Sequence, residues 1–262
     1  FSVPGSATTT EQTVPTYRHG RHEHGQNFLT DPLTIAAITR LVAVTKGPII
    51  EIGPGDGALT TPLARLNRPI TAVEIDARLA RRLTERLPSD VNVITDDFLS
   101  YRLPTSPHVL VGNLPFHQTT AMLRRILHAP GWTEAILLVQ WEVARRRAGV
   151  GGATMMTAQW APWFEFSLHG RVPARAFTPR PGVDGAILSV RRRQQPLLPQ
   201  RQRRQFQELV HRVYTGSGRG LAQILARTTA LASSQAARAW LRQHGVDATG
   251  LPKDLPVEAW VD

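Results

Sequence analysis

Short apolar runs alternate with amphipathic stretches along the first two thirds of this 262-residue chain. Five runs have the length and the β-branched content of buried strands: PIIEIG (48–53), ITAVEID (70–76), VNVIT (91–95), HVLVG (108–112) and AILLVQ (135–140). The stretches between them are long enough for helices, so successive strands are expected to be parallel and joined by right-handed crossovers. The pattern predicts an α/β fold with a mostly parallel, Rossmann-like sheet.

Three helix starts and one hairpin complete this expectation. Asp31 followed by Pro32 is typical of a helix start, and GALTTPLARL after the first strand can open another helix. Leucines recur every fourth position after Asp76, which is expected to cap a helix with arginines on its other face. FEFSLHGRV and GAILSVRRR are predicted to finish the sheet as an antiparallel hairpin.

Changes in composition divide the chain into three parts. Residues 1–24 are polar, contain RHGRHEH and are predicted to form a flexible basic arm. Residues 25–195 contain the strand pattern and are predicted to form the main domain. A basic, proline-containing linker at 191–204 leads into residues 196–262, predicted to be a small all-helical domain with helices at 201–214, 218–229 and 234–244.

The chain is strongly basic, with 31 Lys+Arg against 20 Asp+Glu, a net charge of +11 and a pI near 11.3. This excess favours a polyanionic partner. Arginine greatly outnumbers lysine, which suits phosphate contacts and base stacking but also follows from GC-rich coding, and both explanations stay open. The candidates for contact with such a partner are three clusters, each of which taken alone is more often a solvated face: Arg145, Arg146 and Arg147; Arg191, Arg192 and Arg193; Arg201, Arg203 and Arg204.

Several classes of protein disagree with the composition. The absence of cysteine excludes disulfides, thiolate metal sites and cysteine nucleophiles. No apolar run approaches the roughly 20 residues that span a bilayer, and the first residues lack a secretory signal pattern. The histidines at 19, 22 and 24 have no helix or strand to fix them and are assigned to the arm. We therefore expect a cytoplasmic monomer without a metal or a membrane partner.

EIGPGDG at 51–57 places Gly53, Gly55 and Gly57 on a turn between a strand and a helix, where the backbone can approach a ligand. Glu74 ends the next strand, about 20 residues further on, where a carboxylate can bind both hydroxyls of a ribose. The G-x-G-x-G spacing differs from that of dinucleotide sites, and nothing basic stands near the loop to bind a pyrophosphate. The pattern favours an adenosine without phosphates, such as S-adenosylmethionine, over NAD.

GNLPF at 112–116 follows another strand and is expected beside the same crevice. An adenine N6 amine is a poor nucleophile because its lone pair is delocalised into the ring. The Asn113 side-chain oxygen and the Leu114 carbonyl can accept its N–H groups, and Pro115 stiffens the turn that aims them. Phe116 can stack on a flipped base or favour a cationic sulfonium. Asp97 can accept from a cofactor adenine amine, although a turn aspartate is the plainer interpretation.

Six motifs occur here in the order seen in the rRNA adenine N6-methyltransferases: GQNFL (25–29), EIGPGDG, VEID, DDFL, GNLPF and AFTPRPGVDGAIL (176–188). The chain resembles this family over roughly residues 20–192, and QWEVARRRAGVGGATMMTAQW (140–160) resembles its Erm branch. That branch methylates one adenine of 23S rRNA in the macrolide-binding region. The resemblance implies an S-adenosylmethionine-dependent methyltransferase that confers macrolide-type resistance, with 23S rRNA as partner before full subunit assembly.

The resemblance also implies roles for particular residues. The cofactor-binding candidates are Gln26, Asn27, Leu29, Gly53, Gly55, Gly57, Glu74, Ile75, Asp97, Phe98 and Asn113. The catalytic candidates are Asn113, Leu114, Pro115, Phe116 and Phe177, with the two phenylalanines expected to sandwich the target base. Gly185 departs from the family pattern, because relatives commonly have serine after the Val-Asp pair.

Four other functions remain as alternatives. The nearest is dimethylation of 16S rRNA in the small subunit, followed by a nucleic-acid-binding relative that has lost turnover. A DNA adenine methyltransferase is less favoured, because such enzymes usually carry a D/N-P-P-Y/F motif and this chain has Leu114 at its second position. A dehydrogenase disagrees with the glycine spacing.

Overall fold

The computed structural model describes residues 27–262. Its main sheet contains β2 Ile49–Ile52, β3 Ile70–Glu74, β4 Val91–Thr95, β5 His108–Asn113, β6 Trp132–Gln140, β7 Phe164–Val172 and β9 Gly185–Arg192. The α-helices are α1 Pro32–Ala43, α2 Thr60–Ala64, α3 Ala77–Arg86, α4 Thr119–His128, α5 Trp141–Arg147, α6 Met155–Trp160, α7 Arg203–Thr215, α8 Leu221–Thr228, α9 Ser234–Gln243 and α10 Val257–Val261. A separate two-stranded sheet pairs β1 Phe28–Leu29 with β8 Phe177–Thr178. The predicted arm at 1–24, and Gln26, lie outside the described residues.

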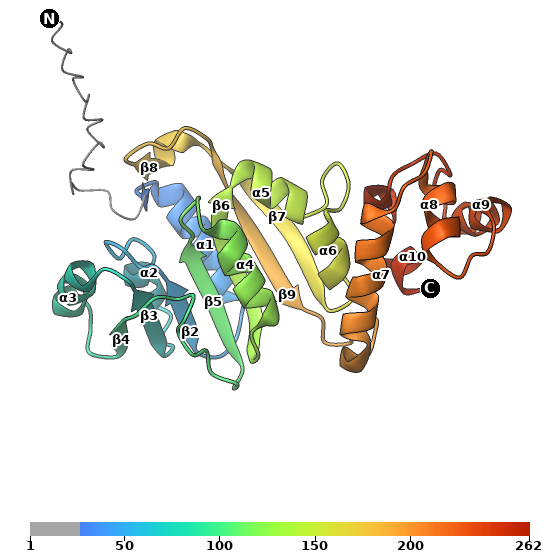
Figure 1. Cartoon of the computed structure of the whole chain (residues 1–262). Coiled ribbons are helices and arrows are strands. Elements are labelled where there is room, and N and C mark those ends of the chain that lie inside the picture. The colour runs from blue at the N-terminus through green and yellow to red at the C-terminus, as the bar shows by residue number, and fades with distance from the viewer. Residues whose placement is uncertain (1–26) are drawn as a thin grey trace, which may run out of the picture.

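The seven strands are ordered β4-β3-β2-β5-β6-β9-β7 (Figure 1). The pairs from β4 to β6 are parallel, whereas β9 runs antiparallel to both β6 and β7. The predicted α/β sheet with a terminal antiparallel hairpin is therefore confirmed. None of the helices in residues 27–262 is long and apolar enough to cross a membrane.

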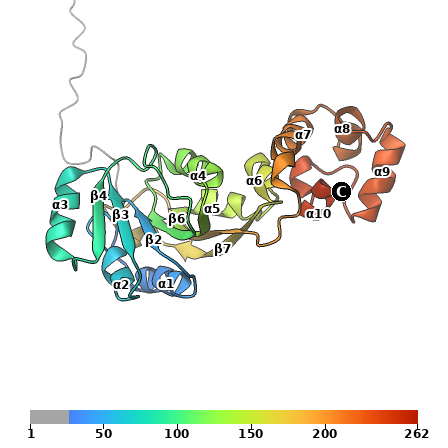
Figure 2. The same cartoon turned by 90° about the horizontal axis from the view of Figure 1, so that it is seen from below.

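Helices cover both faces of the sheet, which explains the continuous apolar runs of its strands. Successive β5 residues face opposite sides, so that Leu110 joins one core and Val111 the other. Ile38 of α1 and Leu63 of α2 pack on the Val111 side, and Leu123 of α4 packs on the Leu110 side. Figure 2 shows α1 and α2 on one side of the strands and α4 on the other.

The helix starts follow the predicted caps, with one shortened helix. The Asp31 carboxylate accepts a 2.8 Å hydrogen bond from the Thr34 N–H, and Asp76 caps α3 in the same way. The helix expected on GALTTPLARL is shorter, because α2 begins only at Thr60. Gly57 just before it has φ +82°, outside the helical region, so the chain remains a turn up to that point.

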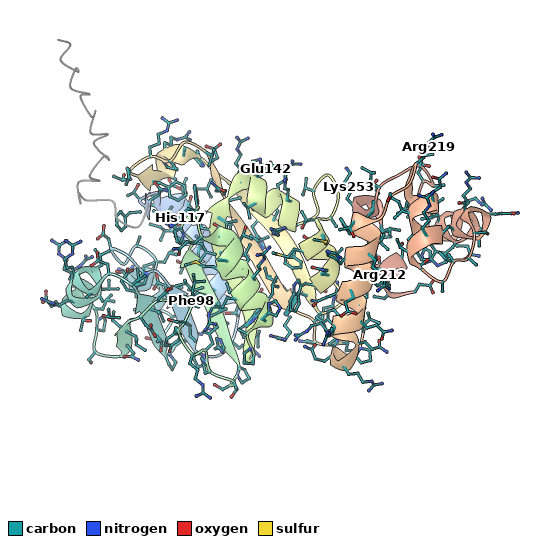
Figure 3. All side chains as sticks on the ribbon, viewed as in Figure 1. Phe98, His117, Glu142, Arg212, Arg219 and Lys253 are labelled. Atoms are coloured by element: carbon teal, nitrogen blue, oxygen red, sulfur yellow. The ribbon has the colours of Figure 1, made fainter. Side chains whose placement is uncertain are left out.

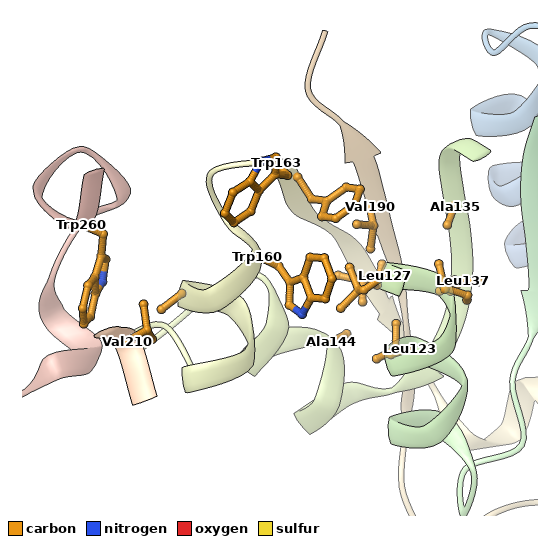
Figure 4. Packing of buried hydrophobic residues seen from close by; sticks show 14 of the residues in the cluster. Leu123, Leu127, Ala135, Leu137, Ala144, Trp160, Trp163, Val190, Val210 and Trp260 are labelled. Carbon is orange, nitrogen blue, oxygen red and sulfur yellow. The ribbon is translucent and has the colours of Figure 1, made fainter. Parts of the chain in front are cut away.

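The three helices predicted beyond residue 200 are confirmed as α7, α8 and α9, and a short α10 adds to them. They form a lobe beside the sheet (Figure 1), yet the hydrophobic core runs through the junction without a break. Trp163 meets Phe206 of α7 edge to face at 5.6 Å between ring centroids, and Gln159 of α6 donates to the Gln207 carbonyl. Figure 4 shows this succession of buried side chains from Leu123 to Trp260.

The topology gives the two edges of the sheet different residues. The carboxyl ends of β2, β3, β5 and β6 meet at the upper edge in Figure 1. Because β9 is antiparallel to β6, Gly185 pairs with Gln140 at this edge, whereas Arg191 pairs with Glu134 nearer the opposite one. Six residues of strand separate these positions, or about 20 Å.

We expect Phe206→Ala to lower the free energy of unfolding by about 3–5 kcal/mol, because it opens a cavity in a shared core. Urea unfolding should show one transition by tryptophan fluorescence and by circular dichroism, with its midpoint lowered in both signals. Gln205→Ala, at an exposed position on the same helix, should leave the midpoint almost unchanged. Two separate transitions, only one of them moved by Phe206→Ala, would instead mean that the lobe folds independently.

Candidate active site

A cleft opens at the carboxyl ends of β2, β3 and β5 and gathers most of the predicted site. The predicted residues that line it are Asn27, Leu29, Gly53, Gly55, Glu74, Ile75, Asp97, Phe98, Asn113, Leu114, Pro115 and Phe116. Residues that the sequence did not single out also line it, among them Phe28, Glu51, Asp56, Asp96, Gln118 and Met122. Gly57 and Phe177 do not line the cleft.

The N-terminal motif reaches the cleft through the small β1–β8 sheet. Leu29 pairs with Phe177, and Phe28 pairs with Thr178. The Thr30 N–H also donates to the Ala176 carbonyl at 2.8 Å. This antiparallel pairing joins two motifs that lie about 150 positions apart in the chain.

Each of the three glycines in the loop after β2 has a different role. Gly53 has φ +61°, and no atom lies within 4 Å of the position that a Cβ would occupy, so its backbone faces open space. Gly55 has φ +56°, and a Cβ there would approach the Phe28 ring to 2.9 Å. At Gly57 a Cβ would lie 2.6 Å from the buried Leu83 of α3, so this glycine serves helix packing.

Glu74 is fully buried at the end of β3, and the backbone holds its carboxylate in place. One oxygen accepts from the Gly55 N–H at 3.0 Å and the other from the Asp76 N–H at 2.9 Å. Each carboxylate oxygen has further lone pairs. The group is therefore oriented in advance and can still accept from a pair of ligand hydroxyls.

Asp97 and Phe98 occupy the turn after β4. The Asp97 carboxylate accepts from the Leu99 N–H at 2.9 Å, as a turn aspartate does, and the residue also lines the cleft. Both interpretations made from the sequence are thus compatible with its position. The buried Phe98 ring lies beneath the Arg125 guanidinium at 5.9 Å, and the same arginine donates to the Phe98 carbonyl.

Asn113 is the last residue of β5, and its side chain is fixed by one hydrogen bond. Its Nδ2 donates to the Asn27 carbonyl at 2.7 Å. A carbonyl can only accept, so this contact determines which end of the amide is nitrogen and leaves Oδ1 as the free acceptor. The Leu114 N–H donates to the Leu138 carbonyl at 3.0 Å, which fastens the following turn to β6. Among the described residues, nothing donates to the Leu114 carbonyl.

The two phenylalanines expected to sandwich a base lie edge to face. Their ring centroids are 6.0 Å apart with an interplanar angle of 73°. Phe116 is half-buried, whereas Phe177 is only 2% exposed. A Cβ at Gly185 would stand 3.1 Å from the Phe177 ring, so the glycine leaves room for that ring. The sandwich stays a prediction, and it requires the rings to separate.

The lining of the cleft is acidic, although the chain is basic. Its ionisable side chains are all carboxylic acids, from Glu51, Asp56, Glu74, Asp96 and Asp97, and none of the lining residues is lysine, arginine or histidine. Such a lining suits a ligand of net positive charge and disfavours a pyrophosphate. The acidic lining is thus an electrostatic reason to favour S-adenosylmethionine over NAD, as the glycine spacing also indicated.

Glu51 is a functional candidate that the sequence reasoning missed. It lies within β2, where all four residues are buried, and one of its carboxyl oxygens has no hydrogen-bond partner among the described residues. Burial, reinforced by the nearby Glu74 carboxylate, raises the pKa of Glu51 to about 8. A carboxylate in the middle of the apolar run PIIEIG was the signal that could have revealed it.

The predicted arginine clusters lie in different places and differ in how far the protein itself uses them. Arg191, Arg192 and Arg193 are near the edge opposite the cleft. Arg192 donates to the Trp132 and Ala129 carbonyls, and Arg193 donates to the Ala161 carbonyl and to Glu165. The internal bonds of Arg192 and Arg193 stabilise the fold, and only Arg191 of this cluster is largely exposed.

The second cluster, at the start of α7, rises from the same lower edge (Figure 1). Arg201 and Arg204 face solvent, and Arg203 lies over the Trp160 ring at 5.2 Å. This cluster is therefore far from the cleft, although it remains available to an extended RNA.

The third cluster, on α5, lies near the cleft edge. Arg145 and Arg146 both bond to Glu142, which lowers the pKa of that carboxyl to about 2, and Arg147 bonds to Thr154. Figure 3 labels Glu142 at the upper edge. Arg171, Arg175 and Arg180 are exposed on the segment that leads to Phe177 and beyond it; the sequence reasoning missed them because they are isolated rather than clustered.

Comparison with known proteins identifies the family to which this site belongs. The family model for "Ribosomal RNA adenine dimethylase" matches residues 18–262. The chain belongs to this family. It is 62% identical over 212 residues to an "rRNA adenine N-6-methyltransferase" of Corynebacterium diphtheriae, covering 80% of this chain and 84% of the relative. The "Mycinamicin-resistance protein MyrB" of Micromonospora griseorubida is 48% identical, covering 92% of this chain and 77% of that protein.

A solved structure agrees with both the fold and the family. The "Crystal structure of 23S rRNA methyltransferase ErmE" superposes with a TM-score of 0.82 at 34% identity, covering 90% of this chain and 97% of the other. The resemblance inferred from the six motifs is therefore confirmed, as is S-adenosylmethionine as the methyl donor of this family member.

We expect Glu51→Gln to remove a pH dependence of stability. The folded protein binds this proton more tightly than the unfolded chain, so wild-type stability should fall as pH rises from 4.5 toward 8. The variant should lack this fall and exceed wild type at pH 8.5 by about 3 °C or more in Tm. Thermal unfolding without ligand at pH 5 and 8.5 measures the change in Tm with pH. The same change in wild type and variant would contradict the protonation assigned to Glu51.

Gly53→Ala and Gly57→Ala form a matched pair for the glycine loop. Both place a side chain at positive φ, which costs about 1–2 kcal/mol. Only Gly53→Ala projects a methyl group into the open cleft, so it should weaken binding of S-adenosylmethionine by at least about tenfold. Gly57→Ala should lose more stability but little affinity. Calorimetric titration with the cofactor measures the affinity of each variant, and equal losses of affinity would contradict the separate roles of the two glycines.

Proposed function

We propose that this protein transfers a methyl group from S-adenosylmethionine to the N6 amine of one adenine of 23S rRNA in the macrolide-binding region, and thereby confers macrolide-type resistance. The observation that carries the reaction is the orientation of Asn113, whose Nδ2 is held by the Asn27 carbonyl. The names of the relatives, two methyltransferases and one resistance protein, support the substrate and the biological role.

The corner after β5 can activate an aromatic amine without a base. The Asn113 Oδ1 and the Leu114 carbonyl are two acceptors for the two N–H groups of an adenine N6 amine. Accepting from both groups favours a tetrahedral nitrogen whose lone pair is no longer delocalised into the ring, and this localised pair makes the nitrogen nucleophilic. When bound, the cofactor supplies an electrophilic methyl group on a sulfonium. The proton of the methylated amine leaves to water afterwards.

The cleft fits the proposed cofactor in its charge and its shape. S-adenosylmethionine carries a sulfonium and an ammonium against one carboxylate, and the lining of the cleft offers carboxylates alone. The bare backbone at Gly53 leaves space where a side chain would stand. We assign Glu74 to the ribose hydroxyls, Asp97 to the adenine amine, and Asn27, Leu29, Ile75 and Phe98 to the walls of this site.

The remaining parts of the proposal concern partners and setting. We propose that the target base is sandwiched by Phe116 and Phe177, and that one copy of the chain acts on 23S rRNA in the cytoplasm before the subunit is fully assembled. We further propose that residues 1–24 and 196–262 contact the RNA outside the target nucleotide. No metal is assigned a role in this chemistry, because amine activation and the electrophile are both accounted for.

Methyl transfer is tested with tritiated S-adenosylmethionine and protein-free 23S rRNA. Wild type should label the RNA and create a primer-extension stop at one adenine. Asn113→Ala should lower kcat by about 100-fold or more, because it removes an acceptor that acts on the developing charge. Full activity of that variant would overturn the proposed mechanism.

Two controls separate this function from its alternatives. Parallel assays on 16S-containing particles test for small-subunit dimethylation, and labelling there but not on 23S rRNA would replace the proposed substrate. Calorimetry with the cofactor tests for a binding-only relative, which would bind S-adenosylmethionine and yield no methylated product. Mass spectrometry of the labelled nucleoside distinguishes monomethyladenosine from dimethyladenosine.

A further inference from the structure

A second groove lies beside the catalytic corner, on the outer side of the Phe177 segment. It is an open hollow of about 670 Å³ between the start of α5 and residues 171–184, a size within the range of sites for small organic groups, roughly 300–1,000 Å³. Its principal side chains are Trp141, Glu142, Arg171, Arg180 and Asp184. The proposed chemistry uses none of them.

Asp184 holds the two walls of this groove together through three hydrogen bonds. One of its carboxylate oxygens accepts from the Ala174 N–H at 2.8 Å, and the other accepts from Arg171 Nε at 2.7 Å. Its backbone carbonyl accepts from the Trp141 N–H at 2.9 Å. The backbone hydrogen bond from Ala174, together with Arg171, lowers the pKa of Asp184, so the carboxylate stays charged.

Arg171 is therefore fixed in one orientation on an aromatic surface. Its guanidinium lies over the Trp141 ring, 5.2 Å from the ring centre, and its side chain is still 60% exposed. Within the described residues, its hydrogen bonding uses Nε alone, which leaves the terminal nitrogens and the outer face open. RNA-binding proteins use guanidinium planes and aromatic rings in this way to stack unpaired bases.

Arg180 adds a cation that the protein does not use for itself. It is exposed and forms no hydrogen bond or ion pair with a described residue; it acts on Asp184 only through its charge. Glu142 on the other wall is already paired with Arg145 and Arg146. The charged side chains that line the groove are thus two arginines and two carboxylates. Both carboxylates are already paired with arginine, so Arg180 is left to bind an anion.

The groove is also at the correct distance from the reaction. Asn113 pairs with Leu138, and Trp141 follows three residues later on the adjoining strand end, about 10 Å further along. Gly185, next to Asp184, is packed against Phe177. A nucleotide bound in the groove would therefore neighbour one whose base lies between Phe116 and Phe177.

We propose that the Trp141–Arg171–Arg180 groove binds an unpaired nucleotide adjacent to the target adenine, its base against Arg171 and its phosphate at Arg180. The proposal rests on the proposed RNA methyl transfer. An enzyme that flips a base must hold the strand beside it, and a stack followed by a phosphate contact does this without reading a complete sequence.

The test compares two double variants that remove the same charge. Arg171→Ala/Arg180→Ala should raise KM for protein-free 23S rRNA by about tenfold or more, with kcat changed less than about threefold. Arg81→Ala/Arg82→Ala, exposed on α3 at the other end of the sheet, should raise KM less than about threefold. Equal increases in KM for the two double variants would contradict the proposed groove, because overall charge alone would then explain the loss of RNA binding.

Single conservative variants separate stacking from charge. Arg180→Lys should retain wild-type KM, because a phosphate accepts either cation, whereas Arg171→Lys should not, because lysine offers no plane for a base. If Arg171→Lys behaves as wild type, the stacking role fails. Direct ultraviolet crosslinking of unsubstituted 23S rRNA, which does not require a particular base, should label the peptide that contains Trp141, and no label there would also count against the groove.

Failure of the groove and failure of the proposed function give different results. If wild type methylates 23S rRNA while the Arg171→Ala/Arg180→Ala variant keeps wild-type KM, the groove is wrong and the function stands. If wild type binds S-adenosylmethionine but labels no RNA, the function itself is wrong. Calorimetry with the cofactor and thermal unfolding show for each variant that the cleft and the fold are intact.

Discussion

One hydrogen bond, from the Asn113 amide to the Asn27 carbonyl, connects the parts of this molecule that must act together. Its donor ends the central strand β5, and its acceptor immediately precedes β1, whose pairing with β8 holds the Phe177 segment. The bond makes the amide present oxygen rather than nitrogen to the cleft. The geometry of this bond thus depends on segments from three distant regions of the sequence. If any of them were displaced, the Asn113 amide could rotate and present its NH2 group, a donor, where Oδ1 now accepts.

The second organising constraint is the separation of charge. A protein of net charge +11 contains a cleft whose charged groups are all carboxylates, while exposed arginines lie along the rim on α5 and the 171–180 segment. The cationic methyl donor therefore meets a surface of carboxylates, and the polyanionic RNA meets a surface of arginines only a few residues away. The same arrangement discourages phosphates from entering the cofactor cleft. Buried Glu51 is compatible with this arrangement, because its raised pKa keeps it a neutral acid and so avoids the cost of an unpaired buried charge.

Much of this organisation could be predicted from the sequence because it is local. Strand runs, caps and the glycine turn depend on neighbouring residues, and β4 and β7 begin and end at the predicted residues. The position of Asn113 followed from the rule that clefts form at carboxyl strand ends. The burial of Phe177, by contrast, depends on Gly185 and on the β1–β8 pairing, which no periodicity reveals. Likewise, a run of three arginines does not disclose that Arg192 and Arg193 are used internally to hold carbonyl groups.

The unbroken core between the sheet and the helical lobe has a consequence for how such proteins diversify. Trp163 comes from the segment before β7 and Phe206 from α7, and each ring forms part of the other's packing surface. Exchange of the lobe between relatives by recombination would separate these co-adapted partners, even with a crossover placed in the linker between them. Viable hybrids should therefore inherit both aromatic partners from one parent, so the lobe is passed on as part of the enzyme rather than as an interchangeable cassette.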